Sequence, residues 1–152
     1  MNIVLVEPEI PANTGNIART CAVTGSALHL VRPLGFSTAD KYLKRAGLDY
    51  WRLVEIFYYD CFQEVVENYP GRSFYLVTTK APRSYSDIQY QPDSFLVFGK
   101  ETRGLSPEIL NSSPENQIRI PMVEAARSLN LANSVAVVLF EALRQQGFSG
   151  LK

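Results

Sequence analysis

The chain has 152 residues, of which 46% are apolar and 20% charged, and its formal net charge at pH 7 is zero. This composition is that of a globular protein, and the length suits one domain whose core needs no disulfide or metal. Zero net charge argues against an indiscriminate polycation, such as a basic arm for nucleic acid or for a membrane surface, but it permits a local basic groove. We therefore expect residues 1–152 to form a single domain.

Along the chain, short apolar runs alternate with helical patterns. Strands are expected at residues 3–6, 27–31, 52–57, 74–78, 95–98 and 117–120. Helices are expected after N-cap residues 13–16, at 39–46, at 62–69, from 107 onward and at 131–146. Such alternation predicts an α/β fold, a mostly parallel sheet with helices on both faces. Ligands bind outside the carboxyl ends of such strands, which directs attention to the loops after residues 6, 78, 98 and 120.

The N-terminus lacks a basic signal region, and the longest apolar run near the C-terminus, residues 135–140, is too short for a membrane span. Cys21 and Cys61 have no CxxC partner, so we expect reduced thiols in a cytoplasmic protein. His29 is the only histidine and lies in the middle of an expected strand. We therefore interpret it as structural and expect no metal site.

Two polar segments follow expected strands. Residues 13–19 open the first helix, and their free N–H groups could bind an anion or simply form a capped turn. Residues 98–105 form a charged loop between Gly99 and Gly104. Gly99 permits close approach of a ligand to the backbone and Gly104 permits a positive φ, although both glycines could serve the turn alone.

A third polar segment surrounds the start of the last helix. Its polar residues are Ser128, Asn130, Asn133 and Ser134. One of them is needed as the N-cap. The others are poor helix formers and require hydrogen-bond partners when buried, so they either serve a ligand or satisfy a neighbouring loop.

These three segments resemble, in order, the three motifs of the SpoU branch of the knotted SPOUT methyltransferases. They stand here as Asn13–Arg19, as Phe98–Leu105, and as Ile120–Met122 with Ser128–Val135. Residues 7–11, 44–50 and 127–130 also look like the minimal single-domain family that methylates the wobble nucleotide of tRNA. The resemblance covers nearly the whole chain.

The resemblance implies a deep C-terminal trefoil knot and a tRNA 2′-O-methyltransferase acting on the wobble cytidine or uridine. It implies S-adenosylmethionine as the methyl donor, no metal, a homodimer formed by the first and last helices, and no DNA or membrane partner. Residues implied to contact the methyl donor are Val77, Gly99, Gly104, Ile120, Met122, Ser128 and Leu129. Residues implied to act on the hydroxyl are Arg19 of the opposite subunit, Asn13, Ser128 and Asn133.

Individual roles follow from side-chain chemistry. An arginine stays protonated, so we favour Arg19 as the group that holds the phosphate beside the ribose, oriented by Asn13, over Arg19 as a general base. Glu101 lies near the methionyl part of the donor or pairs with Arg103 or Lys100. Phe140 stands where relatives often carry tyrosine and cannot supply that hydroxyl.

Three other functions remain open. They are an rRNA 2′-O-methyltransferase of the same fold, a non-catalytic knot that binds S-adenosylmethionine or RNA, and a flavodoxin-like cofactor binder. The last is disfavoured because no phosphate-binding loop follows Val6.

The zero net charge conceals an uneven distribution. Residues 32–52 carry a net +3, residues 53–70 carry −4 and residues 71–103 carry +2. We therefore expect a local tRNA groove that includes Arg19, Lys44, Arg45 and Arg103, with salt-sensitive affinity.

Overall fold

The computed structural model describes residues 1–37 and 50–152. Its centre is a seven-stranded sheet in the order β3-β2-β1-β6-β4-β7-β5, and every pair of neighbouring strands is parallel. The strands are β1 (Asn2–Val6), β2 (Ala27–Val31), β3 (Ile56–Tyr59), β4 (Phe74–Val77), β5 (Arg83–Ser84), β6 (Phe95–Phe98) and β7 (Gln117–Arg119). The expected parallel sheet is confirmed.

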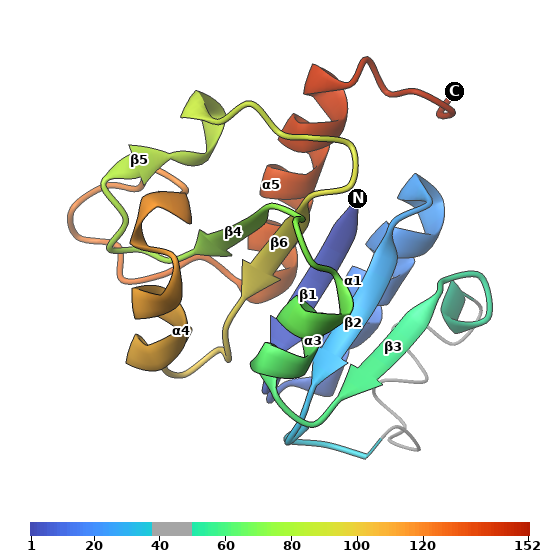
Figure 1. Ribbon diagram of the computed structural model, residues 1–152, viewed down its shortest axis with the longest axis horizontal. Coiled ribbons are helices and arrows are strands. Elements are labelled where there is room, and N and C mark those ends of the chain that lie inside the picture. Colours follow the sequence, from blue (N-terminus) through green and yellow to red (C-terminus); the bar gives the residue numbers. More distant parts are fainter. Residues whose placement is uncertain (38–49) are drawn as a thin grey trace.

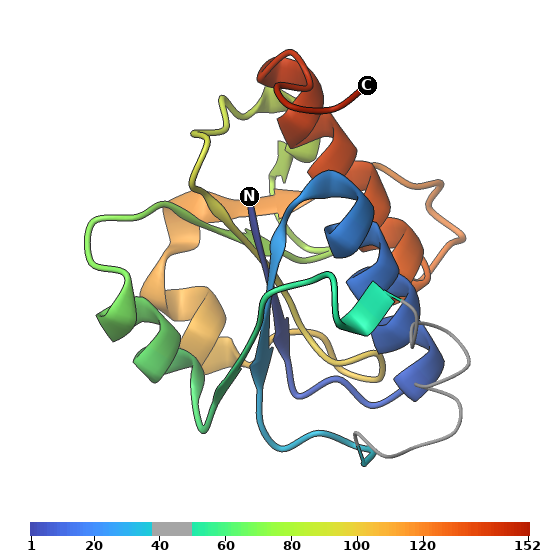
Figure 2. The same cartoon turned by 90° about the vertical axis from the view of Figure 1, so that its right-hand side faces the viewer.

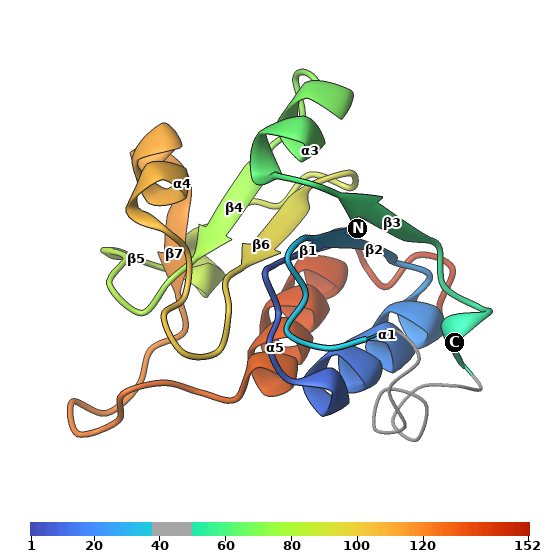
Figure 3. The same cartoon turned by 90° about the horizontal axis from the view of Figure 1, so that it is seen from below.

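Helices cover both faces of this sheet, as the alternating pattern predicts (Figure 1). The long helices α1 (Pro11–Thr24) and α5 (Leu131–Gln145) lie side by side on one face, and α3 (Phe62–Asn68) and α4 (Pro107–Ser112) cover the other (Figures 2 and 3). Alternate side chains of each strand enter the two resulting cores. In β1, for example, Ile3 packs toward α1 and α5, whereas Val4 packs toward α3 and α4.

The third strand lies later in the chain than predicted. Tyr50 and Trp51 are helical, the chain then turns at residues 52–53 with the Leu53 N–H donating to the Tyr50 carbonyl at 2.8 Å, and β3 begins only at Ile56. The apolar side chains of Trp51 and Val54 pack against the core from this segment. Because these positions pack against the core, they are apolar, and the sequence around them therefore looks like a strand. The helix predicted at 39–46 lies outside the described residues.

The two long helices begin in different ways. The prediction that residues 13–16 cap α1 is wrong, because α1 begins at Pro11 after Ile10 and has no side-chain cap. Proline suits the first helical turn, where its missing N–H leaves no hydrogen bond unmade. The start of α5 does carry the expected polar cap: Asn130 Oδ1 accepts from the N–H groups of Ala132 and Asn133 at 2.9 and 3.2 Å.

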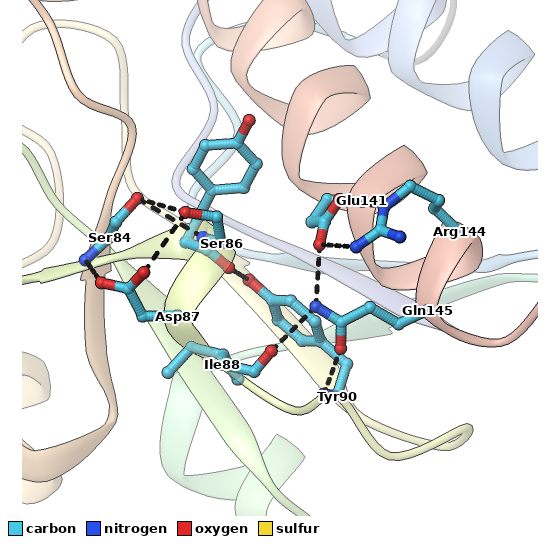
Figure 4. A network of polar contacts seen from close by, with 9 residues as sticks. Ser84, Ser86, Asp87, Ile88, Tyr90, Glu141, Arg144 and Gln145 are labelled. Carbon is cyan, nitrogen blue, oxygen red and sulfur yellow. Dashed lines mark hydrogen bonds and ion pairs between the residues drawn. The ribbon is translucent and has the colours of Figure 1, made fainter.

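The far end of α5 is fastened to the segment that leads into β6 (Figure 4). The Gln145 side chain donates to the Ile88 carbonyl at 2.8 Å and accepts from the Tyr90 N–H at 3.1 Å. Hydrogen bonds from Arg144 and Gln145 lower the pKa of Glu141 to about 2. The amide of Gln145 therefore ties the helix to a segment more than fifty residues earlier in the chain.

His29 is a fully buried structural residue, as predicted from its place in a strand. Its Nε2 lies 3.2 Å from Asn2 Oδ1, an acceptor, so Nε2 carries the proton. Its Nδ1 then accepts from the Tyr59 hydroxyl at 3.0 Å. The ring stacks on Phe57, with centroids 5.0 Å apart. The neutral imidazole thus makes both of its hydrogen bonds inside an aromatic core.

We expect the stability of the fold to fall with acidification because of His29. Burial lowers the pKa of His29 from 6.5 to about 4. The unfolded chain therefore binds the proton more readily, and the contribution is fully present above pH 6.5 and lost as the pH falls toward 4. Its size is about 3 kcal/mol. Urea unfolding of wild type and His29→Gln between pH 7 and 4 measures it. The variant should show the shallower pH dependence, and equal slopes would contradict the assignment.

Candidate functional site

The carboxyl ends of three adjacent strands bring together three of the predicted contacts to the methyl donor. In the order β6-β4-β7, Val77 ends β4 and is paired in register with Phe98 and with Ile118. Gly99 directly follows Phe98, and Ile120 directly follows β7. Val77 and Ile120 both pack on the side of the sheet that carries α5. This edge, on the α5 side, is the candidate site.

The loop after β6 folds back on its own first residue. The Gly104 N–H donates to the Lys100 carbonyl at 2.8 Å, and Gly104 has a φ of 69°. A Cβ atom on Gly99 would lie only 2.0 Å from the Gly104 carbonyl carbon and 2.2 Å from the Leu105 nitrogen. Gly99 is therefore needed because the chain itself, at residues 104–105, lies against it. This favours the interpretation that both glycines serve the turn.

The same loop is bonded to the segment between β1 and α1. The Lys100 ammonium pairs with the Glu7 carboxylate, and the Thr102 N–H donates to the Glu9 carboxylate at 3.0 Å. Strand order reverses between β1 and β6, and ligands of doubly wound sheets bind at such a switch point. Here the two loops fill that position themselves.

Among the residues described, Glu101 forms no ion pair with Arg103 or Lys100, and its predicted place near the methionyl part of the donor stays a prediction. Its carboxylate accepts from the N–H groups of Glu9 and Ile10, at 2.8 and 3.2 Å, and from Asn13 Nδ2 at 2.9 Å. These N–H groups lie at the start of α1, where the helix dipole favours a negative charge. Glu101 thus supplies, from a distant loop, the acceptor that the start of α1 lacks.

Asn13 extends this contact to the start of α5. Its Oδ1 accepts from Asn130 Nδ2 at 3.0 Å, while its own amide donates to Glu101. Asn13 is buried, and its described side-chain hydrogen bonds go to Glu101 and Asn130, so no described hydrogen bond joins it to Arg19 as the predicted orienting role would require. Glu101, Asn13 and Asn130 therefore join the three motif segments into one network. Asn130 both caps α5 and bonds a neighbouring segment, the two roles that the sequence interpretation leaves open for the polar residues at this helix start.

Replacing Glu101 with glutamine should destabilise the fold by about 2 kcal/mol, because a hydrogen bond to a charged group is worth roughly that amount and the amide turns a donor toward other donors. Urea unfolding measures the loss. Glu108→Gln is the control, since Glu108 is an exposed carboxylate in the first turn of α4. Equal, small effects of the two variants would show that the contacts of Glu101 with α1 contribute nothing.

The other predicted site residues face solvent. Arg19 is exposed on α1, and residues 121–130, which include Met122, Ser128 and Leu129, are exposed along their whole length. Asn133 is also exposed, in the first turn of α5. Within a single chain, no hydrogen bond among the described residues joins Arg19, Ser128 and Asn133.

A cavity among the described residues lies away from this edge. It measures about 430 Å³ and lies between α3 and α4, on the face opposite α1 and α5. Apolar side chains such as Phe62, Phe74 and Ile109 line it, and none of the predicted site residues does. Within the described ranges, no three acidic, cysteine or histidine side chains are grouped to hold a metal ion. No helix in the same ranges has the length and apolarity needed to cross a membrane.

Comparison with known proteins gives consistent matches. Residues 1–140 match the pattern of the SpoU rRNA Methylase family. A relative from Listeria innocua is 56% identical over 153 residues, covering 99% of this chain and 90% of that protein. A relative from Photorhabdus asymbiotica, named tRNA (cytidine(34)-2′-O)-methyltransferase, is 52% identical over 156 residues, covering 99% of this chain and 96% of that protein.

A solved structure that concerns the 2-OH methylation of C/U34 on tRNA superimposes with a TM-score of 0.92. It is 42% identical and covers 96% of this chain and 95% of its own. An AdoMet-bound rRNA methyltransferase from Sinorhizobium meliloti superimposes with a TM-score of 0.84 at 25% identity, covering 94% of this chain but 55% of its own.

Proposed function

The chain belongs to the SpoU rRNA Methylase family, and from that premise we propose that it is a tRNA 2′-O-methyltransferase acting on the wobble cytidine or uridine. One observation carries the proposal: a relative named for this reaction on cytidine 34 is 52% identical over nearly the full length of both chains. We further propose that residues 1–152 act as one domain, in the cytoplasm, where tRNA is found.

S-adenosylmethionine is the proposed methyl donor, bound at the edge formed by β6, β4 and β7. Backbone groups at the ends of adjacent strands suit the polar edge of an adenine, and the half-exposed side chains of Met122 and Leu129 suit its apolar faces. The proposed contacts are Val77, Gly99, Gly104, Ile120, Met122, Ser128 and Leu129. The donor supplies a methyl group already activated by the positive sulfonium.

The chain has to bind the RNA and prepare the ribose hydroxyl. Arg19, protonated, would hold the phosphate beside the ribose through its planar fork of N–H groups and stabilise charge on the hydroxyl oxygen. Ser128 and Asn133, both exposed near the start of α5, would position the hydroxyl and the donor. The network of Glu101, Asn13 and Asn130 would hold the two helix starts that carry these groups.

Exposed cations on the loops of the candidate site would meet the tRNA phosphates. Surface ion pairs engage Arg32, Arg72, Lys100 and Arg144. Lys80, Arg103 and Arg127, on the loops after β4, β6 and β7, are exposed and have no such pair among the residues described. Lys44 and Arg45, which we expected in the same groove, lie outside the described residues.

We also propose a homodimer through α1 and α5. Val23 of α1 is 55% exposed and Phe140 of α5 is 43% exposed, although both are large apolar side chains on the two helices that lie side by side. An interface there would cover them and would bring Arg19 of one subunit toward the candidate site of the other. Light scattering coupled to size exclusion gives the mass directly.

A trefoil knot in the C-terminal third is part of the same proposal. Strand β7 lies between β4 and β5, although these two strands are linked directly by residues 78–82. The chain that continues from β7 into α5 thus runs close to the segment that leaves β4 and returns as β6. The bonds from Gln145 to Ile88 and Tyr90 would fasten that crossing.

The test is methylation of bulk tRNA and, in a parallel reaction, of ribosomal RNA with labelled S-adenosylmethionine, followed by mass spectrometry of the nucleosides. We expect a 2′-O-methyl group at the wobble ribose. Methylation of ribosomal RNA in its place would favour the rRNA enzyme of the same fold. Binding of the donor without transfer to either RNA would favour a non-catalytic knot.

A further inference from the structure

Arg19 has one described partner, and that partner is aromatic. The guanidinium carbon lies over the Tyr50 ring, 4.6 Å from its centroid. Nη2 lies 3.4 Å from the Tyr50 hydroxyl, a long hydrogen bond. Arg19 is exposed on α1, and Tyr50 is half-buried. The side chain on which the proposed chemistry depends therefore rests on the face of Tyr50.

Tyr50 is held in place by the turn that follows it. Tyr50 and Trp51 are helical, and the Leu53 N–H donates to the Tyr50 carbonyl at 2.8 Å as the chain turns at residues 52–53. Trp51 and Val54 pack against the core between the sheet, α1 and α5. Tyr50 is therefore joined to a partly buried, packed neighbour and has little freedom to move, whereas an exposed arginine side chain alone has many rotamers.

We propose that Tyr50 is the positioning residue for Arg19, holding the guanidinium by its flat face so that its N–H edge stays free for a substrate phosphate. The inference rests on the proposed function, because it gives Arg19 its task there. It also gives a role to one residue of the segment 44–50, which resembles the wobble-specific family. Tyr50 itself touches neither the donor nor the reacting atoms.

The ring, not the hydroxyl, should carry the effect. An aromatic face attracts a guanidinium without engaging its N–H groups, and here only the long bond from Nη2 to the Tyr50 hydroxyl, which Tyr50→Phe removes, uses one of them. The aromatic ring leaves the positive charge of the guanidinium unneutralised. A carboxylate partner would neutralise it and would occupy the pair of N–H groups that a phosphate needs. Phenylalanine at position 50 should therefore preserve the function, and alanine or leucine should not.

A matched control exists in the same protein. Arg32 lies over the Tyr58 ring at 5.5 Å from its centroid, and both side chains are exposed. Arg32 Nη1, however, pairs with Asp60 Oδ1 at 2.9 Å, so the guanidinium N–H groups of Arg32 already have a carboxylate partner. Tyr58→Ala removes a comparable arginine–tyrosine contact that the proposal assigns no part in the reaction.

The experiment compares Tyr50→Phe, Tyr50→Ala, Tyr50→Leu and Tyr58→Ala in the full-length protein. We expect Tyr50→Ala and Tyr50→Leu to lower kcat for wobble methylation about three- to tenfold. Tyr50→Phe and Tyr58→Ala should stay near wild type, and the affinity for S-adenosylmethionine should be unchanged in all four. Equal rates throughout, or equal losses in Tyr50→Phe and Tyr50→Ala, would overturn the proposal.

A second measurement does not depend on activity. In an NMR spectrum of protein labelled with ¹⁵N arginine, the ring current of Tyr50 should displace the Arg19 Nε–H signal, and Tyr50→Leu should abolish the displacement while Tyr50→Phe keeps it. No displacement in the wild type would overturn the stacked geometry. A displaced signal in a protein that methylates no tRNA would instead show that the proposed function, not the contact, has failed.

Discussion

Replacing Gly99 with alanine is expected to abolish binding of S-adenosylmethionine and to lower the free energy of unfolding by about 3 kcal/mol or more. The added Cβ atom would lie 2.0 Å from the Gly104 carbonyl carbon and 2.4 Å from its oxygen. Both atoms belong to the backbone, so no side-chain rotation relieves the overlap. The loop has to open, and with it the bonds from Lys100, Glu101 and Thr102 to the segment before α1.

Gly104→Ala, in the same loop, is the control that separates steric overlap from backbone strain. Its φ of 69° disfavours alanine, but no atom lies within 4 Å of the added Cβ. We expect a loss of about 1 kcal/mol, from the left-handed conformation alone. Urea unfolding and isothermal titration with S-adenosylmethionine measure both variants. If Gly99→Ala were no worse than Gly104→Ala, the folded-back loop would not be the structure in solution.

Hydrophobic pattern predicts the strands of this fold well, and the reason is visible in the strands themselves. Residues 27–31 and 95–98 are strands with the expected bounds, because each is a short run that is apolar apart from His29 and lies within a parallel sheet covered on both faces. The run at 52–57 misleads, because Val54 packs against the core from the bend that precedes β3 and not from a strand. The two-residue strand β5 is not predicted, because it is defined only by its pairing with β7 and contains no apolar run.

For the candidate site, the sequence likewise predicts some features and not others. The resemblance selects segments correctly, since Asn13, Glu101 and Asn130 of the three motifs do meet, across as many as 117 residues of sequence. The roles within the segments follow only from geometry. Glu101 looked like a group for the methyl donor or for an ion pair, because nothing in its local sequence shows that α1, ninety residues earlier, begins without a side-chain cap.

Arg19→Ala is expected to lower kcat about 10²- to 10³-fold while leaving the affinity for S-adenosylmethionine unchanged. Losing one preorganised group that stabilises developing charge costs about this much. Arg19→Lys should recover only part of the rate, because lysine keeps the charge but not the planar fork. Arg72→Ala is the matched control: Arg72 is an exposed arginine paired with Asp93, just before the amino end of β4. Single-turnover methylation with the donor saturating measures the four proteins.

Mixed dimers test where Arg19 acts. If it serves the site of the opposite subunit, co-expression of Arg19→Ala with a variant that cannot bind the donor, such as Leu129→Glu, should restore activity that neither variant has alone. In such a dimer one site has an intact donor loop and receives Arg19 of the partner subunit. If Arg19 serves its own chain, every site in the mixture lacks one of the two groups and the mixture stays inactive. The exposed position of Arg19 on α1, away from the Glu101–Asn13–Asn130 network of its own chain, favours the first outcome.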